Sequence, residues 1–299
     1  MTQRHVVVLG GTGFVGRHLV SRLLQGGDRV TVLSRGSDAA KRRLKPDGAS
    51  LIEGDVANAD FLAAVLDDAD AVVNLVGILN EKGDRGDGFE HVFVGITDAL
   101  IDAMRRMGVR RLLQMSALNA GRGESHYLQA RGRAEQRVRA SGLDWTLFRP
   151  SVIAGPGDGL FCRFDGLLKF APVLPIGRAD ARFQPVWVGD VVEAYAKALD
   201  DPRSVGQSYD LIGPDVMTLK QIVKLAARGR SRHRMVIGLP ATLGKLQAEV
   251  GEWLPGKPIS RDNWRSLQLD SVSMEDGLRR LGLTPTPVEP RVAELLRHC

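Results

Sequence analysis

The chain has 299 residues, of which 43% are hydrophobic, and its formal net charge is +6. This length suits one large α/β domain or a domain with a smaller lobe. No apolar run approaches the roughly 20 residues that a membrane-spanning helix needs, so we expect no transmembrane segment. The first strand pattern begins at residue 5, which leaves no room for a signal peptide and predicts a cytoplasmic protein.

Cysteine, histidine and basic residues narrow the function classes further. Cys162 and Cys299 lie far apart, which predicts two free thiols in a reducing compartment. The six histidines show no metal-ligand spacing, so we expect no metal site. The densest basic stretch, residues 220–234, lacks the interleaved aromatic residues of a nucleic-acid binder, and no nucleic-acid partner is expected. Two alternatives remain open for it: a solvated helix end, or a docking patch for a membrane or an acidic partner.

Short valine-rich strands alternate with helical patterns through the first half of the chain. This alternation predicts a parallel sheet with helices on both faces, and right-handed crossovers make it a doubly wound Rossmann sheet. We therefore expect an α/β fold in which residues 1–150 form an NAD(P)-binding Rossmann domain. The predicted strands cover residues 5–10, 29–35, 49–55, 70–77, 109–117 and 143–151, and the longest predicted helix covers 89–108.

The regular alternation of strand and helix patterns ends after Pro150, where prolines separate shorter elements. Residues 184–201 read as a strand that runs into a helix, for which Asp190 is the expected cap. A second helix is predicted over 217–229, with Thr218 as its cap. We expect residues 151–299 to complete the sheet and to form a smaller C-terminal α/β lobe for a substrate or partner.

A glycine-rich segment between the first strand and the first helix predicts a dinucleotide site. Gly10 permits the tight turn, Gly13 lets the backbone approach a pyrophosphate, and Gly16 lets the helix pack on the sheet. The helix N-terminus then offers N–H groups and a positive dipole end to the phosphates. The candidate cofactor-binding residues of this segment are Gly10, Thr12, Gly13, Phe14, Val15 and Gly16.

The end of the second strand favours NADP(H) over NAD(H), although NAD(H) remains an alternative. Many NAD binders place an acid about 20 residues after the loop, where it accepts the ribose hydroxyls. Here Ser34 and Arg35 occupy this place, and a guanidinium can bind a 2′-phosphate with two hydrogen bonds. Arg17, next to the loop, is a second cation for the same phosphate.

The chain resembles the extended and atypical short-chain dehydrogenase/reductase superfamily over nearly its whole length. The resemblance rests on the glycine loop, "GDV" (54–56), "NLVG" (74–77), "MSALNA" (115–120) and "RPSVIAGPGD" (149–158). "FQPVWVGDVVEA" (183–194) and "LPGKPISRDNW" (254–264) resemble the branch that includes the nucleotide-binding accessory subunit of respiratory complex I. The resemblance implies that Asp55 and Val56 lie near the adenine. It also implies that Asn74, Leu75, Val76, Gly77 and Pro150 border the cofactor.

In active members of this superfamily a Ser, a Tyr and a Lys four residues after the Tyr carry the chemistry. The resemblance assigns Ser116 and Tyr127 to the first two positions, but position 131 is Arg. Arg131 keeps the positive charge on the same helix face, while its planar fork fixes different hydrogen bonds from an ammonium. The candidate catalytic residues are therefore Ser116, Tyr127 and Arg131, with Ser125 as an alternative hydroxyl.

Two functions from different classes follow. The first is an NADP(H)-binding protein with a structural, assembly or redox-sensing role near respiratory or quinone-handling machinery. Its partners would be the dinucleotide and a respiratory or membrane-associated protein, at the periphery of the inner membrane. The second is an NADP-dependent oxidoreductase or epimerase that acts on a small carbonyl, a quinone or a sugar nucleotide. Arg131 favours the first, and the intact Ser116 and Tyr127 keep the second open.

Overall fold

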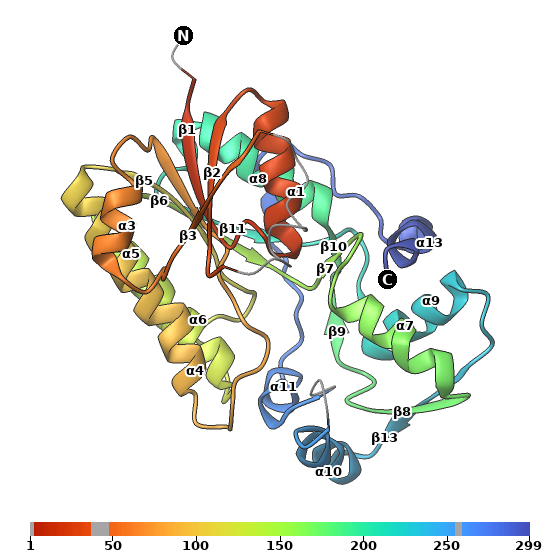
Figure 1. Cartoon of the computed structure of the whole chain (residues 1–299). Coiled ribbons are helices and arrows are strands. Elements are labelled where there is room, and N and C mark those ends of the chain that lie inside the picture. The colour runs from red at the N-terminus through yellow and green to blue at the C-terminus, as the bar shows by residue number, and fades with distance from the viewer. Residues whose placement is uncertain (1–2, 37–47, 255–258) are drawn as a thin grey trace.

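A seven-stranded parallel sheet forms the centre of the computed structural model, which describes residues 3–36, 48–254 and 259–299 (Figure 1). The strand order is β11-β6-β5-β4-β1-β2-β3. Successive strands are therefore added on one side of β1 up to β3, and on its other side from β4 onward. The point between β1 and β4 where this order reverses is the place where doubly wound sheets bind ligands. The strands are β1 (His5–Leu9), β2 (Arg29–Ser34), β3 (Ser50–Glu53), β4 (Ala71–Asn74), β5 (Arg111–Met115), β6 (Asp144–Pro150) and β11 (Gln207–Leu211).

Alternate residues of β1 point to opposite faces of the sheet, and helices bury both faces. Val6 and Val8 pack with residues of α1 (Phe14–Gln25) and α8 (Val188–Asp200). Val7 and Leu9 pack with residues of α3 (Ala59–Val65) and α5 (Ile96–Met107). All five residues of β1 are buried, as expected for a central strand of a parallel sheet. The predicted doubly wound Rossmann sheet is confirmed.

The helix predicted over 89–108 is divided into three parts. A short helix α4 (Asp87–Phe89) leads into a π-helical turn, η1 (Glu90–Gly95), and α5 follows. Phe89 and Phe93 are both buried, and their rings are stacked 6.0 Å apart between centroids. Hydrophobic periodicity alone does not reveal the extra residue of a π-turn, which shifts the helix register locally.

Residues after 150 contribute β11, an edge strand of the sheet, and α8, which covers one of its faces, and the others form a lobe beside the sheet (Figure 1). The lobe contains three two-stranded ladders, β7–β10, β9–β12 and β8–β13. Their strands are β7 (Ile153–Ala154), β8 (Val173–Gly177), β9 (Arg182–Phe183), β10 (Val186–Trp187), β12 (Met217–Thr218) and β13 (Met235–Leu239). The further helices are α6 (His126–Arg139), α7 (Leu160–Phe170), α9 (Leu219–Gly229), α10 (Ala241–Gly251), α11 (Arg261–Ser266), α12 (Gly277–Arg280) and α13 (Val292–Arg297), with 3₁₀ turns η2 (Pro202–Ser204) and η3 (Glu289–Arg291). Residues 255–258 of the 254–264 motif lie outside the described residues.

One of the two predicted helix caps is confirmed and the other is wrong. Thr218 caps α9 through a capping box, in which its hydroxyl accepts from the Gln221 N–H. Asp190, in contrast, lies in the first turn of α8, because the helix begins earlier and Trp187 is its N-cap residue. The Asp190 carboxylate accepts hydrogen bonds from the Thr286 N–H at 2.6 Å and its hydroxyl at 2.8 Å. Asp190 therefore fastens a distant C-terminal segment to α8.

The basic stretch 220–234 has two different parts. Arg230 and Arg232 lie within ion-pair distance of the buried Asp165, at 3.4 and 2.6 Å, so these guanidinium groups stabilise the interior of the lobe. Lys220 and Lys224 make no ion pair within the described residues. A purely solvated helix end is therefore too simple a description of this stretch, because two of its four arginines compensate a buried carboxylate.

The two cysteines form a disulfide that the sequence did not predict. Cys162 on α7 is bonded to Cys299, which follows α13, across a sequence separation of 137 residues. The expectation of two free thiols is therefore wrong. Helix α13 packs against both α7 and α9, and this tertiary packing brings the distant cysteines together.

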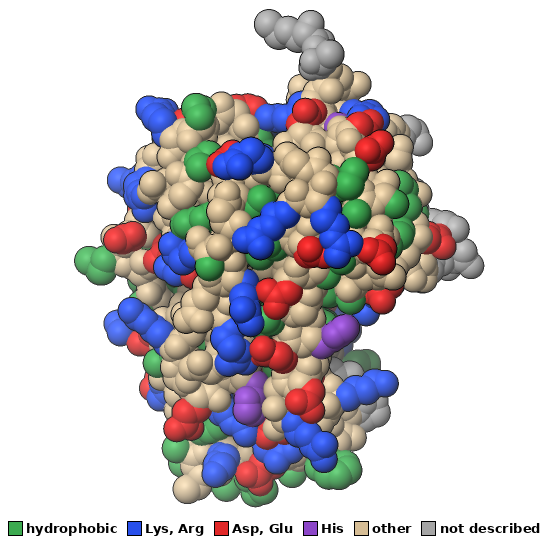
Figure 2. All heavy atoms as spheres, turned by 90° about the vertical axis from the view of Figure 1, so that its left-hand side faces the viewer, with side chains coloured by type: hydrophobic (Ala, Val, Ile, Leu, Met, Phe, Trp, Pro, Cys, Tyr) green, Lys and Arg blue, Asp and Glu red, His purple; other side chains and the backbone are tan. Residues whose placement is uncertain are grey.

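The surface of the Rossmann unit carries charges of both signs. Figure 2 shows Lys and Arg interspersed with Asp and Glu over this face. Exposed ion pairs there include Arg106 with Asp60 and Arg133 with Glu90. Among the described helices, none combines the length and the apolar character needed to cross a bilayer.

Loss of the disulfide should destabilise the protein. We expect Cys299→Ser to lower the free energy of unfolding by about 2–4 kcal/mol, because the unfolded chain is no longer constrained by the closed loop. Urea denaturation followed by circular dichroism measures this change, and Cys162→Ser should give the same value because it removes the same bond. Wild type denatured without reductant should show no reactive thiol. Detection of both thiols would contradict the disulfide.

Candidate functional site

The glycine loop follows β1 at the point where the strand order reverses, and its geometry requires glycine. Gly10 has a φ of +77°, in the left-handed region that favours glycine. A Cβ at Gly16 would lie 2.2 Å from the Gly10 carbonyl oxygen, so no side chain fits there. Gly13 is the N-cap residue of α1 and makes no side-chain cap bond, and the first turn holds no acid. The first N–H groups of α1 can therefore receive an anion.

Ser34 and Arg35 lie at the carboxyl end of β2, as expected for residues that would meet the adenosine ribose. Ser34 is buried and pairs in register with Glu53 of β3, and Arg35 is exposed. Glu53 is an acid that sequence reasoning missed: a Cβ at Gly36 would lie 2.9 Å from its Oε2 atom. The Arg17 guanidinium, predicted as a second cation for the 2′-phosphate, contacts the Pro156 carbonyl oxygen.

Most of the residues that the resemblance places near the adenine and the cofactor lie in two loops, one after β3 and one after β4. The Asp55 carboxylate accepts a hydrogen bond from the Ala57 N–H at 2.9 Å, and Val56 is buried in the core. Asn74 donates to Gln114 at 3.0 Å and accepts from the Val76 N–H at 3.1 Å. This last bond fixes the turn that carries the chain from β4 along Leu75 to Gly77.

A cavity of about 810 Å³ lies between the carboxyl edge of the sheet and the C-terminal lobe. It brings together residues from the glycine loop, the β4 loop, the β5 end and α6, although they are far apart in the sequence. The predicted site residues that line it are Gly10, Gly13, Phe14, Val15, Gly16, Leu75, Gly77, Ser116, Tyr127, Arg131 and Pro150. Thr12, Ser34, Arg35, Asp55, Val56, Asn74 and Val76 do not line it.

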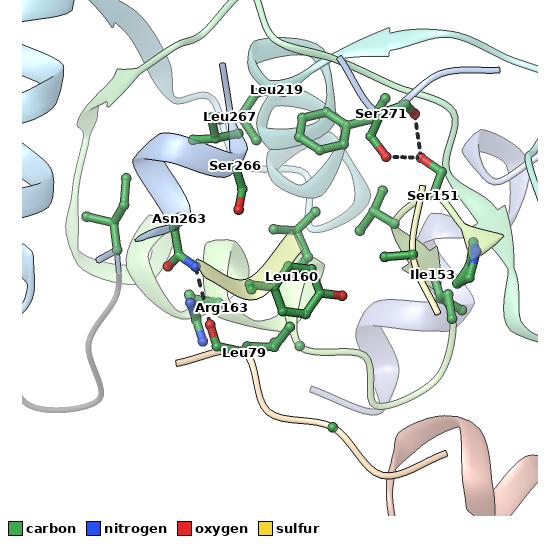
Figure 3. Close-up of a pocket in the computed structure, with 18 of the residues that line it drawn as sticks. Leu79, Ser151, Ile153, Leu160, Arg163, Leu219, Asn263, Ser266, Leu267 and Ser271 are labelled. Carbon is green, nitrogen blue, oxygen red and sulfur yellow. Dashed lines mark hydrogen bonds between the residues drawn. The ribbon is translucent and has the colours of Figure 1, made fainter. Parts of the chain in front are cut away.

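The wall of the cavity that comes from the lobe is mostly apolar (Figure 3). Several of its polar groups already have partners. The Ser151 hydroxyl donates to the Ser271 carbonyl oxygen at 2.8 Å, and Asn263 donates to the Leu79 carbonyl oxygen at 3.3 Å. Sequence reasoning missed this wall, because no local motif marks it. The apolar lining residues include Leu160, Phe164, Leu167, Leu174, Ile176, Phe183, Leu219, Val250, Leu254, Ile259, Leu267 and Leu269.

The Ser116 hydroxyl is engaged by a buried carboxylate. It donates to Glu135 Oε1 at 2.7 Å, and Glu135 is only 4% exposed. Arg149 donates to the same Oε1 atom at 2.7 Å and also contacts Oε2, and these hydrogen bonds raise the pKa of Arg149. Glu135 and Arg149 are site residues that sequence reasoning missed, since 14 residues separate them from each other.

Tyr127 and Arg131 lie on α6 and share an aromatic environment. The Tyr127 ring packs edge-on against Phe89 and Phe93, at centroid separations of 5.9 and 5.5 Å. The Arg131 guanidinium lies over the Phe93 ring at 3.9 Å, and its Nη1 donates to the Met115 carbonyl oxygen at 2.7 Å. Its Nη2 faces Gly77, where a Cβ would approach to 2.9 Å. Arg131 is 6% exposed, and no carboxylate within the described residues forms an ion pair with it.

The N-terminus of α6 is bound by Asp262 of α11. Ser125, the alternative hydroxyl, is the N-cap residue, and it donates to Asp262 at 2.8 Å instead of lining the cavity. The Asp262 carboxylate also accepts from the His126 N–H at 2.7 Å. Asp84 and His126 approach Asp262 closely enough to resemble a metal-ligand group. Both Asp84 oxygens, however, accept from Arg265, which lowers the pKa of Asp84, so this cluster has a structural role as it stands.

Another buried carboxylate, that of Asp158, shapes the turn before α7. Asp158 accepts hydrogen bonds from the Gly155 N–H at 3.3 Å and the Phe161 N–H at 2.7 Å. Burial raises the pKa of Asp158 to about 6, because the ionised form loses hydration. The turn positions Leu160, which points into the cavity (Figure 3).

The family model for NAD(P)H-binding proteins matches residues 10–162. Subunit 9 of the mitochondrial NADH dehydrogenase [ubiquinone] 1 alpha subcomplex from Mus musculus is 30% identical over 97% of this chain and 79% of its own length. A 3 beta-hydroxysteroid dehydrogenase/Delta 5-->4-isomerase of Mycobacterium tuberculosis is 27% identical over 79% of this chain and 72% of its own length.

Solved structures share the fold at lower identity. The UDP-glucose 4-epimerase of Thermus thermophilus, in complex with NAD, superimposes with a TM-score of 0.69 and 23% identity. The match covers 87% of this chain and 99% of the epimerase chain. At this identity the likeness describes the fold and not the activity.

The chain belongs to the family of NAD(P)H-binding proteins and has the Rossmann fold of the short-chain dehydrogenase/reductase superfamily. Within this superfamily it belongs to the atypical branch that resembles the accessory subunit of respiratory complex I. A nicotinamide dinucleotide is the expected cofactor, and this agrees with membership of the NAD(P)H-binding family. The family does not distinguish NAD(H) from NADP(H).

Two glycine substitutions should separate binding from folding. A Cβ at Gly13 meets only the Gly10 carbonyl oxygen, at 3.1 Å, and the Gly13 φ of −75° suits any residue. We expect Gly13→Val to abolish dinucleotide binding without unfolding the sheet, because the side chain occupies the pyrophosphate position. Fluorescence titration with NADPH and thermal unfolding measure the two properties.

Gly16→Val is the matched comparison. It should destabilise the protein as well, because its Cβ would overlap the Gly10 backbone. Normal NADPH binding by Gly13→Val would show that the loop does not hold the pyrophosphate.

Proposed function

We propose that this protein binds NADP(H) tightly, with a degenerate Tyr127-x-x-x-Arg131 site, and serves a structural, assembly or redox-sensing role linked to respiratory or quinone-handling machinery. The observation that carries the proposal is the state of the Arg131 guanidinium. It is buried, stacked on Phe93 and bonded to the Met115 carbonyl oxygen. A group held in this way cannot move freely to a ribose, as a flexible lysine ammonium can.

The preference for NADP(H) is supported by the exposed Arg35 at the end of β2. Its guanidinium can pair with a 2′-phosphate, whereas an acid at this position would repel one. Glu53 of β3 pairs in register with Ser34 next to this position. Buried Arg131 adds a positive charge to the cavity that no described carboxylate neutralises, which favours an anionic ligand.

The loss of efficient chemistry is supported by Ser116 as well. A serine that activates a carbonyl must donate its hydroxyl hydrogen to the substrate oxygen. Here that hydrogen is directed to Glu135, which also accepts a hydrogen bond from Arg149. Two of the three expected catalytic positions are thus engaged by the protein itself.

The apolar lobe wall supports a quinone or a carbonyl with an apolar body over a sugar nucleotide as the second ligand. A sugar nucleotide carries a diphosphate and many hydroxyls, which need charged and hydrogen-bonding partners. The wall consists mainly of leucine, isoleucine and phenylalanine side chains, and Arg163, Gln247 and Asn263 are among its few polar residues. The respiratory link rests on the mouse complex I relative.

An active NADP-dependent oxidoreductase is the second candidate function. It is favoured by the position of Tyr127 on the cavity wall next to Arg131, and by similarity to a relative named as a hydroxysteroid dehydrogenase. The guanidinium carbon of Arg131 lies 5.6 Å from the Tyr127 ring centroid, so the motif keeps a positive charge beside the tyrosine. Turnover assays decide between the two functions.

Arg35 should determine the cofactor preference. We expect wild type to bind NADPH more tightly than NADH in calorimetric titrations. Arg35→Ala should lose about 1.5–3 kcal/mol of NADPH binding, the range for a hydrogen bond to a charged group, and little NADH binding. Equal or tighter NADH binding by wild type would contradict the preference.

If Arg131 is the residue that prevents catalysis, Arg131→Lys should restore the turnover of NADPH. The substitution keeps the charge and supplies a compact ammonium that can meet both a ribose and Tyr127. We expect turnover of NADPH with a panel of carbonyls and quinones to exceed that of wild type. Adding Tyr127→Phe to this variant should remove the gain, because the proton donor is lost.

Two results would contradict the expectation that Arg131 alone prevents turnover. Brisk turnover by wild type that Arg131→Lys slows would make Arg131 a working catalytic residue and favour the enzyme. Tight NADPH binding with no turnover by either form would favour the binding protein, and would indicate that Ser116 and Glu135 also limit chemistry.

A further inference from the structure

Helix α10 packs against the β8–β13 ladder at the lower end of the C-terminal lobe (Figure 1). Helix α10 turns its small residues inward, with Gly244, Ala248 and Gly251 buried. Its larger apolar residues Leu243, Leu246 and Val250 have the i, i+3, i+7 spacing of one helix face, and all are exposed. This helix therefore presents its apolar stripe to the outside.

Side chains next to this helix extend the apolar surface. Trp253 is 90% exposed just after α10, and Phe170 is 88% exposed at the end of α7. Met235 is 60% exposed on β13, and Val173 and Ile237 on the same ladder are also exposed. We call this set the α10 surface: Phe170, Val173, Met235, Ile237, Leu243, Leu246, Val250, Trp253 and Leu254. So many large apolar residues at one end of a protein mark an interaction site.

Cations border the α10 surface. An open hollow of about 1000 Å³ lies between α9 and the β8–β13 ladder, lined by Lys220, Lys224, His233 and Arg234 together with apolar residues of the ladder. Lys220 and Lys224 lie one helical turn apart, and within the described residues neither they nor Lys245 of α10 pairs with a carboxylate. These ammonium groups are available to anions, unlike Arg230 and Arg232, which bind Asp165.

We propose that the α10 surface docks on an anionic lipid bilayer, with phospholipid headgroups bound in the hollow between Lys220, Lys224 and Arg234. Charge complementarity favours this occupant: lysines beside exposed Trp, Leu, Met and Phe residues match an interface of anionic headgroups over acyl chains. An acidic protein could satisfy the lysines, but it would not by itself require so exposed a tryptophan and methionine.

The bilayer would also face an entrance to the cavity. Leu167, Val250 and Leu254 line the cavity and are exposed as well, so its wall reaches the outside beside the α10 surface. A ligand dissolved in the hydrocarbon layer could therefore enter along apolar side chains without crossing water. This inference does not depend on NADP(H) preference or on turnover, and its test uses neither.

The first test measures the charge requirement by sedimentation of the full-length protein with vesicles. We expect binding to phosphatidylcholine vesicles that contain phosphatidylglycerol, and little binding to phosphatidylcholine alone. Raising salt from about 0.1 M to about 1 M, which shortens the Debye length from about 10 Å to about 3 Å, should weaken it. Lys220→Gln/Lys224→Gln should lower the affinity roughly 30-fold, given the usual contribution of each lysine near an anionic surface.

The charge-matched control is Arg110→Gln/Arg137→Gln, which removes two exposed cations from the Rossmann unit. It should bind vesicles as wild type does. An equal loss in this control would show that net charge, and not the hollow, drives binding, and would overturn the proposal. No binding to anionic vesicles at low salt would overturn it too, and would leave a protein partner for the α10 surface.

The second test measures contact with the hydrocarbon layer. Trp253 emission should shift to shorter wavelength on anionic vesicles and should be quenched by lipids with brominated chains; Trp253→Phe identifies its share of the signal. Met235→Ser should weaken vesicle binding, whereas Met274→Ser, at an exposed methionine outside the α10 surface, should not. Binding without any change in Trp253 emission, or equal effects of the two methionine substitutions, would overturn the proposed insertion.

Discussion

The position of helix α6 against the carboxyl edge of the sheet is the constraint on which the site depends. Asp262 binds the backbone at the start of this helix. Gly132, in its middle, is so close to Gly121 that a Cβ would lie 2.4 Å from the Gly121 Cα atom. Glu135, further along, joins it to the ends of β5 and β6 through Ser116 and Arg149. These contacts leave α6 little freedom, and the side chains that it presents to the cavity are correspondingly fixed.

Features that arise from local sequence were predictable. The β1 strand, the glycine loop and the capped start of α9 each follow from a few neighbouring residues, because backbone sterics and hydrogen bonding act over that range. Asp190 shows where this reasoning ends. Its type and spacing suit a cap, but the helix starts earlier and a threonine 96 residues away takes its carboxylate. The Cys162–Cys299 bond is equally a product of packing between helices that no spacing rule connects.

The candidate site also has a part that the sequence predicts and a part that only the folded structure reveals. Ser116, Tyr127 and Arg131 could be proposed from their order along the chain, and the structure places all three on one cavity. The side chains and backbone groups that hold them could not be predicted, because Glu135, Met115 and Phe93 meet them only after the sheet and helices assemble. The apolar wall is assembled from residues between 160 and 271 that belong to several short elements, none of which has a recognisable pattern.

The π-helical turn at Glu90–Gly95 bears on how such a site can arise and be lost in evolution. A π-turn is an α-helix that contains one additional residue. Deleting a single residue there would restore regular winding and rotate the preceding segment by roughly 100° relative to α5, since each residue of an α-helix accounts for that angle at 3.6 residues per turn. The Phe93 ring would then no longer lie against the Arg131 guanidinium, although the Tyr-x-x-x-Arg motif would be unchanged. Relatives that differ by one residue in this helix can thus share the motif and still hold the arginine quite differently.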